Sequence, residues 1–125
     1  MVSSDGSAVT ALLPRLISSN KIEGIPVLSR DGDKLGAVSA FLVDRFDGQV
    51  NFVIVAMGGL LGLGSSYHPV PWCLISFEPG RDGYVIAVDR AVLSSGPSFK
   101  GGTDQLFDAA FTGRILSYFA VAEPR

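Results

Sequence analysis

The run Val50–Met57, which reads Val-Asn-Phe-Val-Ile-Val-Ala-Met, constrains the fold more than any other part of the chain. Successive side chains of a β-strand point to opposite faces. Both faces are apolar here, with Val50, Phe52, Ile54 and Ala56 on one and Val53, Val55 and Met57 on the other. A strand of this kind needs cover on both sides. We therefore expect residues 49–57 to form a central strand, with a core on one face and a second layer on the other.

Turn signals on both sides of this strand predict an antiparallel meander. The Asp-Gly pairs at 31–32 and 47–48 favour tight hairpins, and Gly36 within a strand predicts a bulge or a sharp bend. Pro69 and Pro71 lack a backbone donor and belong at a strand start or a sheet edge. Short strands at this spacing predict a small sandwich or barrel. The expected strands are residues 25–28, 34–38, 41–44, 49–57, 67–77 and 84–88.

The two ends of the chain are expected to lie outside the central domain. Residues 1–20 are expected to form a partly disordered N-terminal arm, whose apolar part lies on the body of the protein or on a neighbouring copy. Residues 21–99 are the expected domain, closing with a helical turn capped by Asp89. Residues 100–125 are an expected extension with a loose tail and a short helix opened by Thr103 or Asp104. An apolar residue recurs there every fourth position, at Phe107, Phe111, Ile115 and Phe119.

Charge and composition exclude several functional classes. The 12 acidic and 10 basic residues are scattered, so the clustered Lys and Arg that nucleic-acid binding needs are missing. One Cys and one His cannot form a four-ligand zinc site, and no metal or cofactor is expected. The longest apolar run, about a dozen residues, falls short of the roughly 20 that span a membrane as a helix. No secretory signal is visible, so the cytoplasm is the expected compartment.

Three local features suggest sites but favour structural roles. The glycines of residues 58–64 neither open a helix nor precede Lys-Ser or Lys-Thr, so we interpret them as a tight turn and not as a phosphate loop. Cys73 lies in an apolar stretch and is interpreted as a buried thiol. Trp72 is interpreted as a core residue or an interface anchor.

His68 is the one side chain that titrates near neutral pH. It would need a serine and an aspartate to form a hydrolytic triad, and a serine this close in sequence rarely reaches productive geometry. We interpret His68, together with Tyr67, as a polar rim that hydrogen-bonds the barrel or a partner chain. The candidate partners for such a triad are Ser65, Ser66, Asp44 and Asp47. The two aspartates are better explained by their roles in the turn.

Five segments in this order resemble the PRC-barrel family, which includes the cytoplasmic domain of the photosynthetic reaction centre H subunit, the C-terminal domain of the ribosome-maturation factor RimM, and small stand-alone bacterial proteins. The resemblance implies an all-β fold, a small, highly curved antiparallel β-barrel of five to six strands with a short helical C-terminal extension. It implies a docking module and no set of catalytic residues. The segments are Gly-Ile-Pro-Val at 24–27, Asp-Gly-Asp-Lys-Leu-Gly at 31–36, Asp-Gly-Gln-Val at 47–50, Gly-Gly-Leu-Leu-Gly-Leu-Gly at 58–64 and Tyr-His-Pro-Val-Pro-Trp at 67–72.

The function that follows is a non-enzymatic protein-protein interaction module, a stand-alone PRC-barrel protein that docks onto an unidentified protein and forms a homodimer. Its mean hydropathy of +0.37 leaves apolar surface to hide. Two alternatives stay open: an accessory factor in RNA or ribosome maturation, as the RimM resemblance implies, and a small-molecule binder using the His68 rim. The candidate interface residues are Val53, Val55, Met57, Leu60, Leu61, Trp72, Phe107, Phe111 and Phe119.

Overall fold

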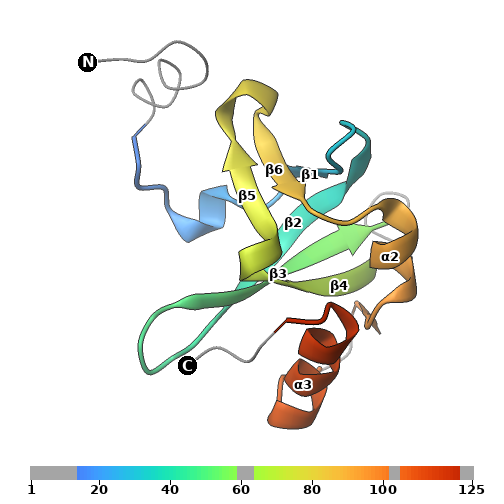
Figure 1. Ribbon diagram of the computed structural model, residues 1–125. Helices are drawn as coiled ribbons and strands as arrows, with labels where there is room; N and C mark the ends of the chain where they lie inside the picture. Colours follow the sequence, from blue (N-terminus) through green and yellow to red (C-terminus); the bar gives the residue numbers. More distant parts are fainter. Residues whose placement is uncertain (1–13, 59–63, 102–104, 122–125) are drawn as a thin grey trace.

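The computed structural model describes residues 14–58, 64–101 and 105–121, and in these segments the chain forms one seven-stranded sheet of order β5-β6-β1-β2-β3-β4-β7 (Figure 1). One helical segment precedes the first strand, one follows the last strand, and the others lie between strands along the chain. The strands are β1 (Pro26–Leu28), β2 (Lys34–Val43), β3 (Val50–Met57), β4 (Ser66–Pro71), β5 (Ile75–Glu78), β6 (Gly83–Ile86) and β7 (Phe99–Lys100). The helical segments are η1 (Ser19–Lys21), η2 (Trp72–Leu74), η3 (Pro79–Arg81), α2 (Arg90–Ser95) and α3 (Ala109–Tyr118).

Strands β1 to β4 form the expected antiparallel meander. Gly32 and Gly48 have φ of +93° and +78°, a conformation that glycine adopts without strain, so both predicted turns are confirmed. The register between β1 and β2 shifts where Val27 faces Gly36 and Leu28 faces Lys34, which is the bulge expected at Gly36. Residues 34–43 form one long irregular strand where two were expected.

The β-rich fold class is confirmed, but the expectation of purely antiparallel strands is wrong. β6 returns beside β1 in parallel, with Val27 opposite Tyr84 and Leu28 opposite Val85. The sheet has seven strands instead of five or six, and within the described segments its end strands β5 and β7 are not paired to each other. The curved sheet is therefore barrel-like without closure by hydrogen bonds.

The predicted strand over residues 67–77 is broken by a turn into two strands, and the short strand β7 was not expected. η2 separates β4, which pairs with β3, from β5, which pairs with β6. Pro69 and Pro71 face Ile54 and Phe52 of β3. On its other side β4 pairs with β7 only at Ser66 and Tyr67, so the prolines lie where no second strand needs their missing donors.

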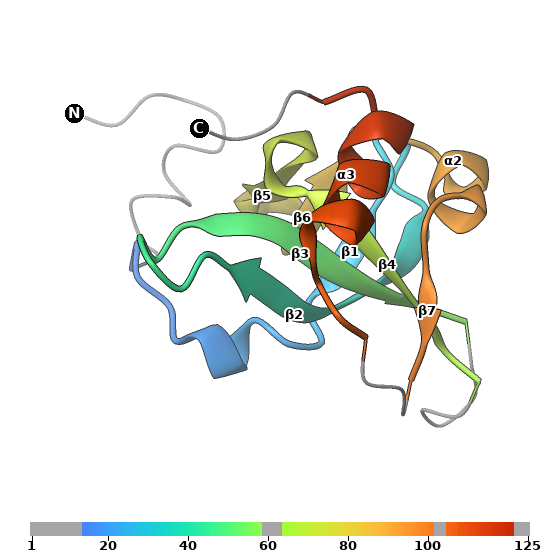
Figure 2. The ribbon, with the colours of Figure 1, turned by 90° about the horizontal axis from the view of Figure 1, so that it is seen from below.

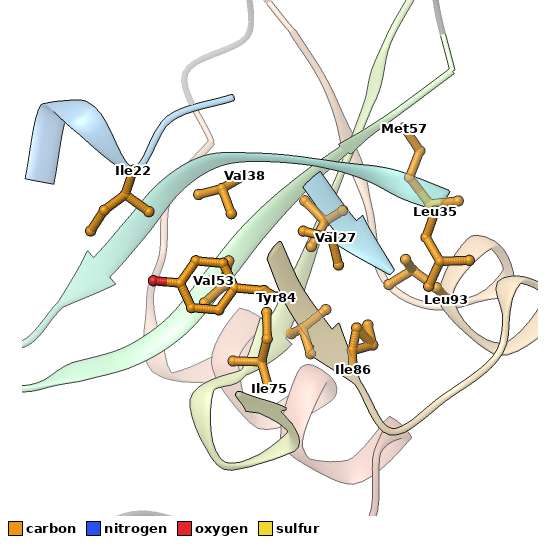
Figure 3. Close-up of a cluster of buried hydrophobic side chains, with 12 residues drawn as sticks. Ile22, Val27, Leu35, Val38, Val53, Met57, Ile75, Tyr84, Ile86 and Leu93 are labelled. Carbon is orange, nitrogen blue, oxygen red and sulfur yellow. The ribbon is translucent and has the colours of Figure 1, made fainter. Parts of the chain in front are cut away.

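The main core fills the concave side of the sheet (Figure 3). Val53 and Val55 of β3 are fully buried there, with Ile86 of β6 and Leu93 of α2. The buried members of this cluster are Ile22, Val27, Leu35, Val38, Val53, Val55, Met57, Val70, Ile75, Tyr84, Ile86 and Leu93. One face of the central strand thus supplies the core, as its sequence predicts.

The opposite face of β3 is covered by the C-terminal helix α3 (Figure 2). Phe52 packs in a second cluster with Phe111, Ile115 and Leu116 of α3, all of them buried. Two members of the expected stripe, Phe111 and Ile115, are therefore buried against the sheet, whereas Phe107 precedes the helix and is exposed. Asp108 caps α3 by accepting a hydrogen bond from the Phe111 backbone N–H at 2.9 Å. The caps proposed from the sequence, Thr103 and Asp104, lie outside the described residues.

Candidate docking surface

Four aromatic side chains from four separate elements meet at one end of the sheet and form what we call the aromatic cluster. Phe41 comes from β2, Trp72 from η2, Phe77 from β5 and Tyr84 from β6. The ring centroids lie 5.3 Å apart for Phe41 and Trp72, 6.3 Å for Trp72 and Tyr84, and 5.4 Å for Phe77 and Tyr84, all in edge-to-face geometry. Edge-to-face rings at these separations attract each other beyond the effect of burial alone.

The aromatic cluster is buried at its centre and open at its ends. Tyr84 is 7% exposed, whereas Trp72 and Phe77 are 36% and 41% exposed. Burial raises the pKa of Tyr84 above its ordinary value, so this phenol stays neutral at physiological pH. The pairing of β5 with β6 sets Phe77 directly opposite Tyr84. The exposed rings are therefore held in position by a fixed support.

A groove of about 460 Å³, here called the β2 groove, begins where the aromatic cluster ends at Phe41. Its walls come from the segment around η1 and from strands β2 and β3. Figure 3 shows Ile22 and Val38 of this wall side by side. The lining is mostly apolar and consists of Ile17, Ser19, Ile22, Glu23, Val38, Ala40, Phe41, Val43 and Val50.

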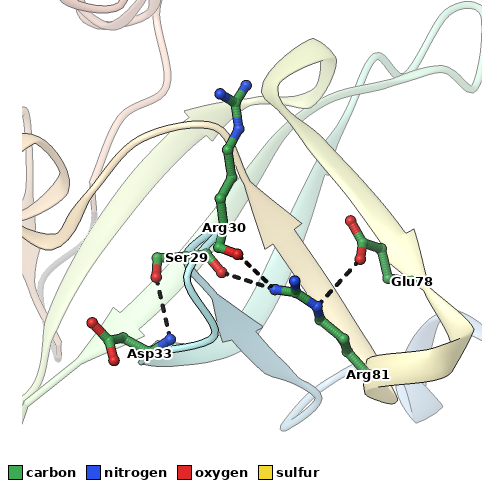
Figure 4. Close-up of polar contacts among 5 residues, drawn as sticks. All are labelled: Ser29, Arg30, Asp33, Glu78 and Arg81. Atoms are coloured by element: carbon green, nitrogen blue, oxygen red, sulfur yellow. Dashed lines mark hydrogen bonds and ion pairs between the residues drawn. The ribbon is translucent and has the colours of Figure 1, made fainter.

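A second hollow, of about 390 Å³, lies against β5 and β6 and is bordered by Arg30, Cys73 and Arg81. Arg81 Nη1 donates to the backbone carbonyls of Ser29 at 3.3 Å and Arg30 at 3.0 Å, and Arg81 Nε lies 3.5 Å from Glu78 Oε1 (Figure 4). Arg81 therefore ties the β5–β6 hairpin to the turn after β1. Cys73 is exposed here, so the prediction of a buried thiol is wrong. The η2 turn, which local hydropathy does not reveal, carries its side chain outward.

His68 lies inside the protein, at 3% exposure, and not on an open rim. Its Nε2 is 2.8 Å from Ser66 Oγ, and its Nδ1 is buried without a hydrogen-bond partner of good geometry in the described part of the chain. Burial lowers the pKa of His68 below its ordinary value, and a backbone interaction with Leu93 opposes this shift in part. The neutral imidazole is the favoured form.

The structure brings Ser66 and His68 together, although a serine and a histidine this close in sequence rarely meet. Alternate residues of a strand share a face, and Ser66 and His68 both belong to β4. The aspartates are engaged elsewhere: Asp44 Oδ1 accepts from the Phe46 N–H at 2.8 Å, and Asp47 Oδ1 accepts from the Gln49 N–H at 2.8 Å. These are the expected turn roles, and no third member of a triad faces His68 among the hydrogen bonds of the described residues.

Of the seven candidate interface residues that the structure describes, four are buried. Val53, Val55 and Met57 are in the main core, Phe111 of α3 is buried in the second cluster with Phe52, and Phe119 is half-buried. Trp72 and Phe107 are exposed at 36% and 41%, while Leu60 and Leu61 lie outside the described residues. Tyr67 of the proposed rim is half-buried and stacks on Phe99, with ring centroids 5.5 Å apart. Phe41, Phe77 and Tyr84 were missed, and only the apolar character of their strands signals them.

The interpretation of the glycines at 58–64 as a turn agrees with the two glycines of this run that the structure describes. Gly58 and Gly64 have φ of +68° and +78°, which suits a turn between β3 and β4. Gly59 and Gly62 lie outside the described residues. Across residues 14–58, 64–101 and 105–121, no group of three or more His, Cys, Asp or Glu side chains is placed to hold a metal ion. No helix in those same segments is long and apolar enough to cross a membrane.

A curved sheet with a buried concave face and a partly exposed aromatic cluster defines a small β-rich domain. The chain belongs to the PRC-barrel domain family, whose model matches residues 14–93. No curated protein matches the sequence. Among solved structures, the chain is similar to a 16S ribosomal RNA processing protein, RimM, from Pseudomonas aeruginosa, with 15% identity and a TM-score of 0.40. That match covers 65% of this chain and 48% of the RimM chain. The present chain therefore spans about half the length of the RimM protein.

Proposed function

We propose that the protein is a non-enzymatic docking module of the PRC-barrel family that binds a partner protein through the aromatic cluster. The observation that carries this proposal is the exposure of Trp72 and Phe77, at 36% and 41%, on either side of the buried Tyr84. Aromatic side chains are enriched at protein interfaces, and tryptophan is among the residues that most often carry the binding energy there. The ring contacts of the cluster supply such a support.

The chemistry of the surroundings favours a protein partner. The hollow beside β5 carries the charged groups of Arg30, Glu78 and Arg81, and the β2 groove on the other side of the cluster is mostly apolar. An apolar centre with a polar border is the usual composition of a protein-protein interface. The net charge of −2 adds no strong field that would attract nucleic acid.

Photo-crosslinking at a single position tests this function. Phe77 is replaced by p-benzoylphenylalanine in the full chain, expressed in its native cells, and Phe46 is replaced in the same way as a control. Phe46 is 94% exposed on the β2–β3 hairpin and makes no ring contact with the cluster in the described part of the chain. We expect one discrete adduct from position 77, reduced by Trp72→Ala, and none from position 46. Equal labelling from both positions, or none from position 77, would contradict docking through the cluster.

The identity of the adduct separates the candidate functions. A second copy of this chain would support the homodimer expected from the sequence, and light scattering on the full chain would then give a dimer that Trp72→Ala converts to monomer. A ribosomal protein would favour the alternative in ribosome maturation. A small-molecule site at His68 is not supported, because the ring is buried and already bonded to Ser66.

A further inference from the structure

The β2 groove is an apolar depression with no occupant among the described residues. Val38 is buried in its floor, while Val43 is 52% exposed at its rim and Ile17 is 54% exposed at its entrance. Glu23 is the one charged residue in the lining. Exposed apolar surface of this kind is unfavourable in water and usually has a binding role.

The described chain begins at Pro14, three residues before Ile17, which already lines the groove. Thirteen residues precede Pro14, and the last six of them read Ala-Val-Thr-Ala-Leu-Leu, without any charge. An extended segment of six residues reaches about 20 Å at roughly 3.3 Å per residue. Residues 8–13 are thus uncharged and are joined to the entrance of the groove by a linker of only three residues, 14–16.

We propose that residues 8–13 of the same chain bind in the β2 groove, with Leu12 and Leu13 supplying the apolar contacts. A short covalent tether gives the segment an effective concentration of about the millimolar order, which an arm from another molecule does not have at ordinary protein concentrations. The occupied groove would cover Phe41, whose ring centroid is 5.3 Å from that of Trp72.

Paramagnetic relaxation in the full chain tests the proposal without reference to any partner. A nitroxide is attached to Ala11→Cys in a Cys73→Ser background, because the native Cys73 is exposed and would also react. We expect the methyl signals of Val38 and Val43 to broaden. The control is the same labelled protein after chemical reduction of the nitroxide, which removes the unpaired electron and should leave these methyls sharp.

A mixed sample distinguishes the same chain from a second copy. Spin-labelled protein without isotopes is mixed with isotope-labelled protein without the nitroxide. We expect no broadening in this mixture. Broadening there would show that the groove takes the arm of another molecule and would overturn the same-chain assignment, while sharp signals in both samples would overturn occupation of the groove by this segment.

Substitutions at exposed positions test the binding of the arm without disturbing the buried core. Val43→Asp places a charge at a half-exposed position of the groove, and Phe46→Asp is the matched change outside it. We expect Val43→Asp to abolish the broadening at Val38 and Phe46→Asp to preserve it. The same broadening in both variants would contradict binding in the β2 groove. These outcomes do not depend on the docking function proposed above, which position 77 tests separately.

Discussion

The Nε2 atom of His68 lies 2.8 Å from Ser66 Oγ, while Nδ1 of the same ring is buried without a well-aligned partner. The ring is 3% exposed, so its protonation would place a charge inside the protein. Burial accordingly lowers the pKa of His68 from its ordinary value of 6.5. This relationship couples the stability of the fold to pH.

The free energy of unfolding should fall as the pH drops below the ordinary histidine range. Because the unfolded chain has the higher pKa, it binds more protons between the two pKa values, and protonation favours unfolding. The contribution of His68 is complete above pH 6.5 and is lost as the pH falls through the lowered pKa of the folded state. Its slope cannot exceed about 1.4 kcal/mol per pH unit. Urea titrations between roughly pH 7.5 and 5.5, above the usual carboxylate range, measure it. His68→Gln should remove this slope, and an unchanged slope in the variant would assign it to other groups.

Gly36→Ala should destabilise the protein by about 1–3 kcal/mol, the usual range for forced overpacking. A Cβ at Gly36 would press against the backbone carbonyl oxygen of Ala56 and lie 3.1 Å from Val55 Cγ1. Backbone in the middle of a sheet cannot move aside at low energy. Gly80→Ala is the control, because nothing lies within 4 Å of the added atom. Urea midpoints of both variants compare the two sites, and an equal, small change would show that β2 and β3 can separate locally.

Ile115→Ala should lower the free energy of unfolding by about 2–5 kcal/mol, as for other fully buried aliphatic side chains. Ile115 is 0% exposed, between α3 and Phe52 of the sheet. Leu106→Ala, at a site that is 70% exposed just before the helix, should change little. Hydrogen exchange should show faster exchange of the α3 amides in the first variant. Unchanged protection of α3 would mean that the helix is held by other contacts.

Arg81→Lys should loosen the turn that follows β1 with little effect on global stability. Lysine keeps the charge but cannot span both backbone carbonyls that Arg81 reaches, those of Ser29 and Arg30. The Arg81 side chain is 41% exposed, so we expect a change below about 1 kcal/mol in unfolding free energy. Amide exchange at Gly32 and Asp33 should accelerate. Arg30→Lys is the control, since the Arg30 side chain points away from Arg81 (Figure 4), and it should leave these amides unaffected.

Short-range sequence patterns were sufficient to predict the antiparallel meander of β1 to β4. The two apolar faces of Val50–Met57 predicted both a core and a cover, and the structure supplies them as the main core and α3. The glycines at 32 and 48 and the Asp89 cap, which accepts from the Val92 N–H at 2.9 Å, follow from backbone requirements within a few residues. Such features depend on near neighbours, which the sequence displays directly.

The remaining differences come from contacts between distant segments. The parallel pairing of β1 with β6 and the break at η2 are decided by how the second half of the chain packs on the first. The same holds for the aromatic cluster, whose rings come from four elements, and for the outward direction of Cys73. By residue type the sequence offers several caps near this helix, and the structure shows Asp108 in that role, with Phe111 packed in the same cluster as Phe52.

The parallel contact between β1 and β6 also sets the order in which the protein can fold. Strands β1 to β4 join through hairpins and can form from neighbouring residues, whereas Val27 meets Tyr84 only after the chain has returned past η2. Closing such a long loop is entropically unfavourable, and non-local pairings of this kind slow folding. The aromatic cluster needs Phe77 and Tyr84 in place, so we expect the proposed docking surface to be absent from any partly folded chain that has formed the meander alone.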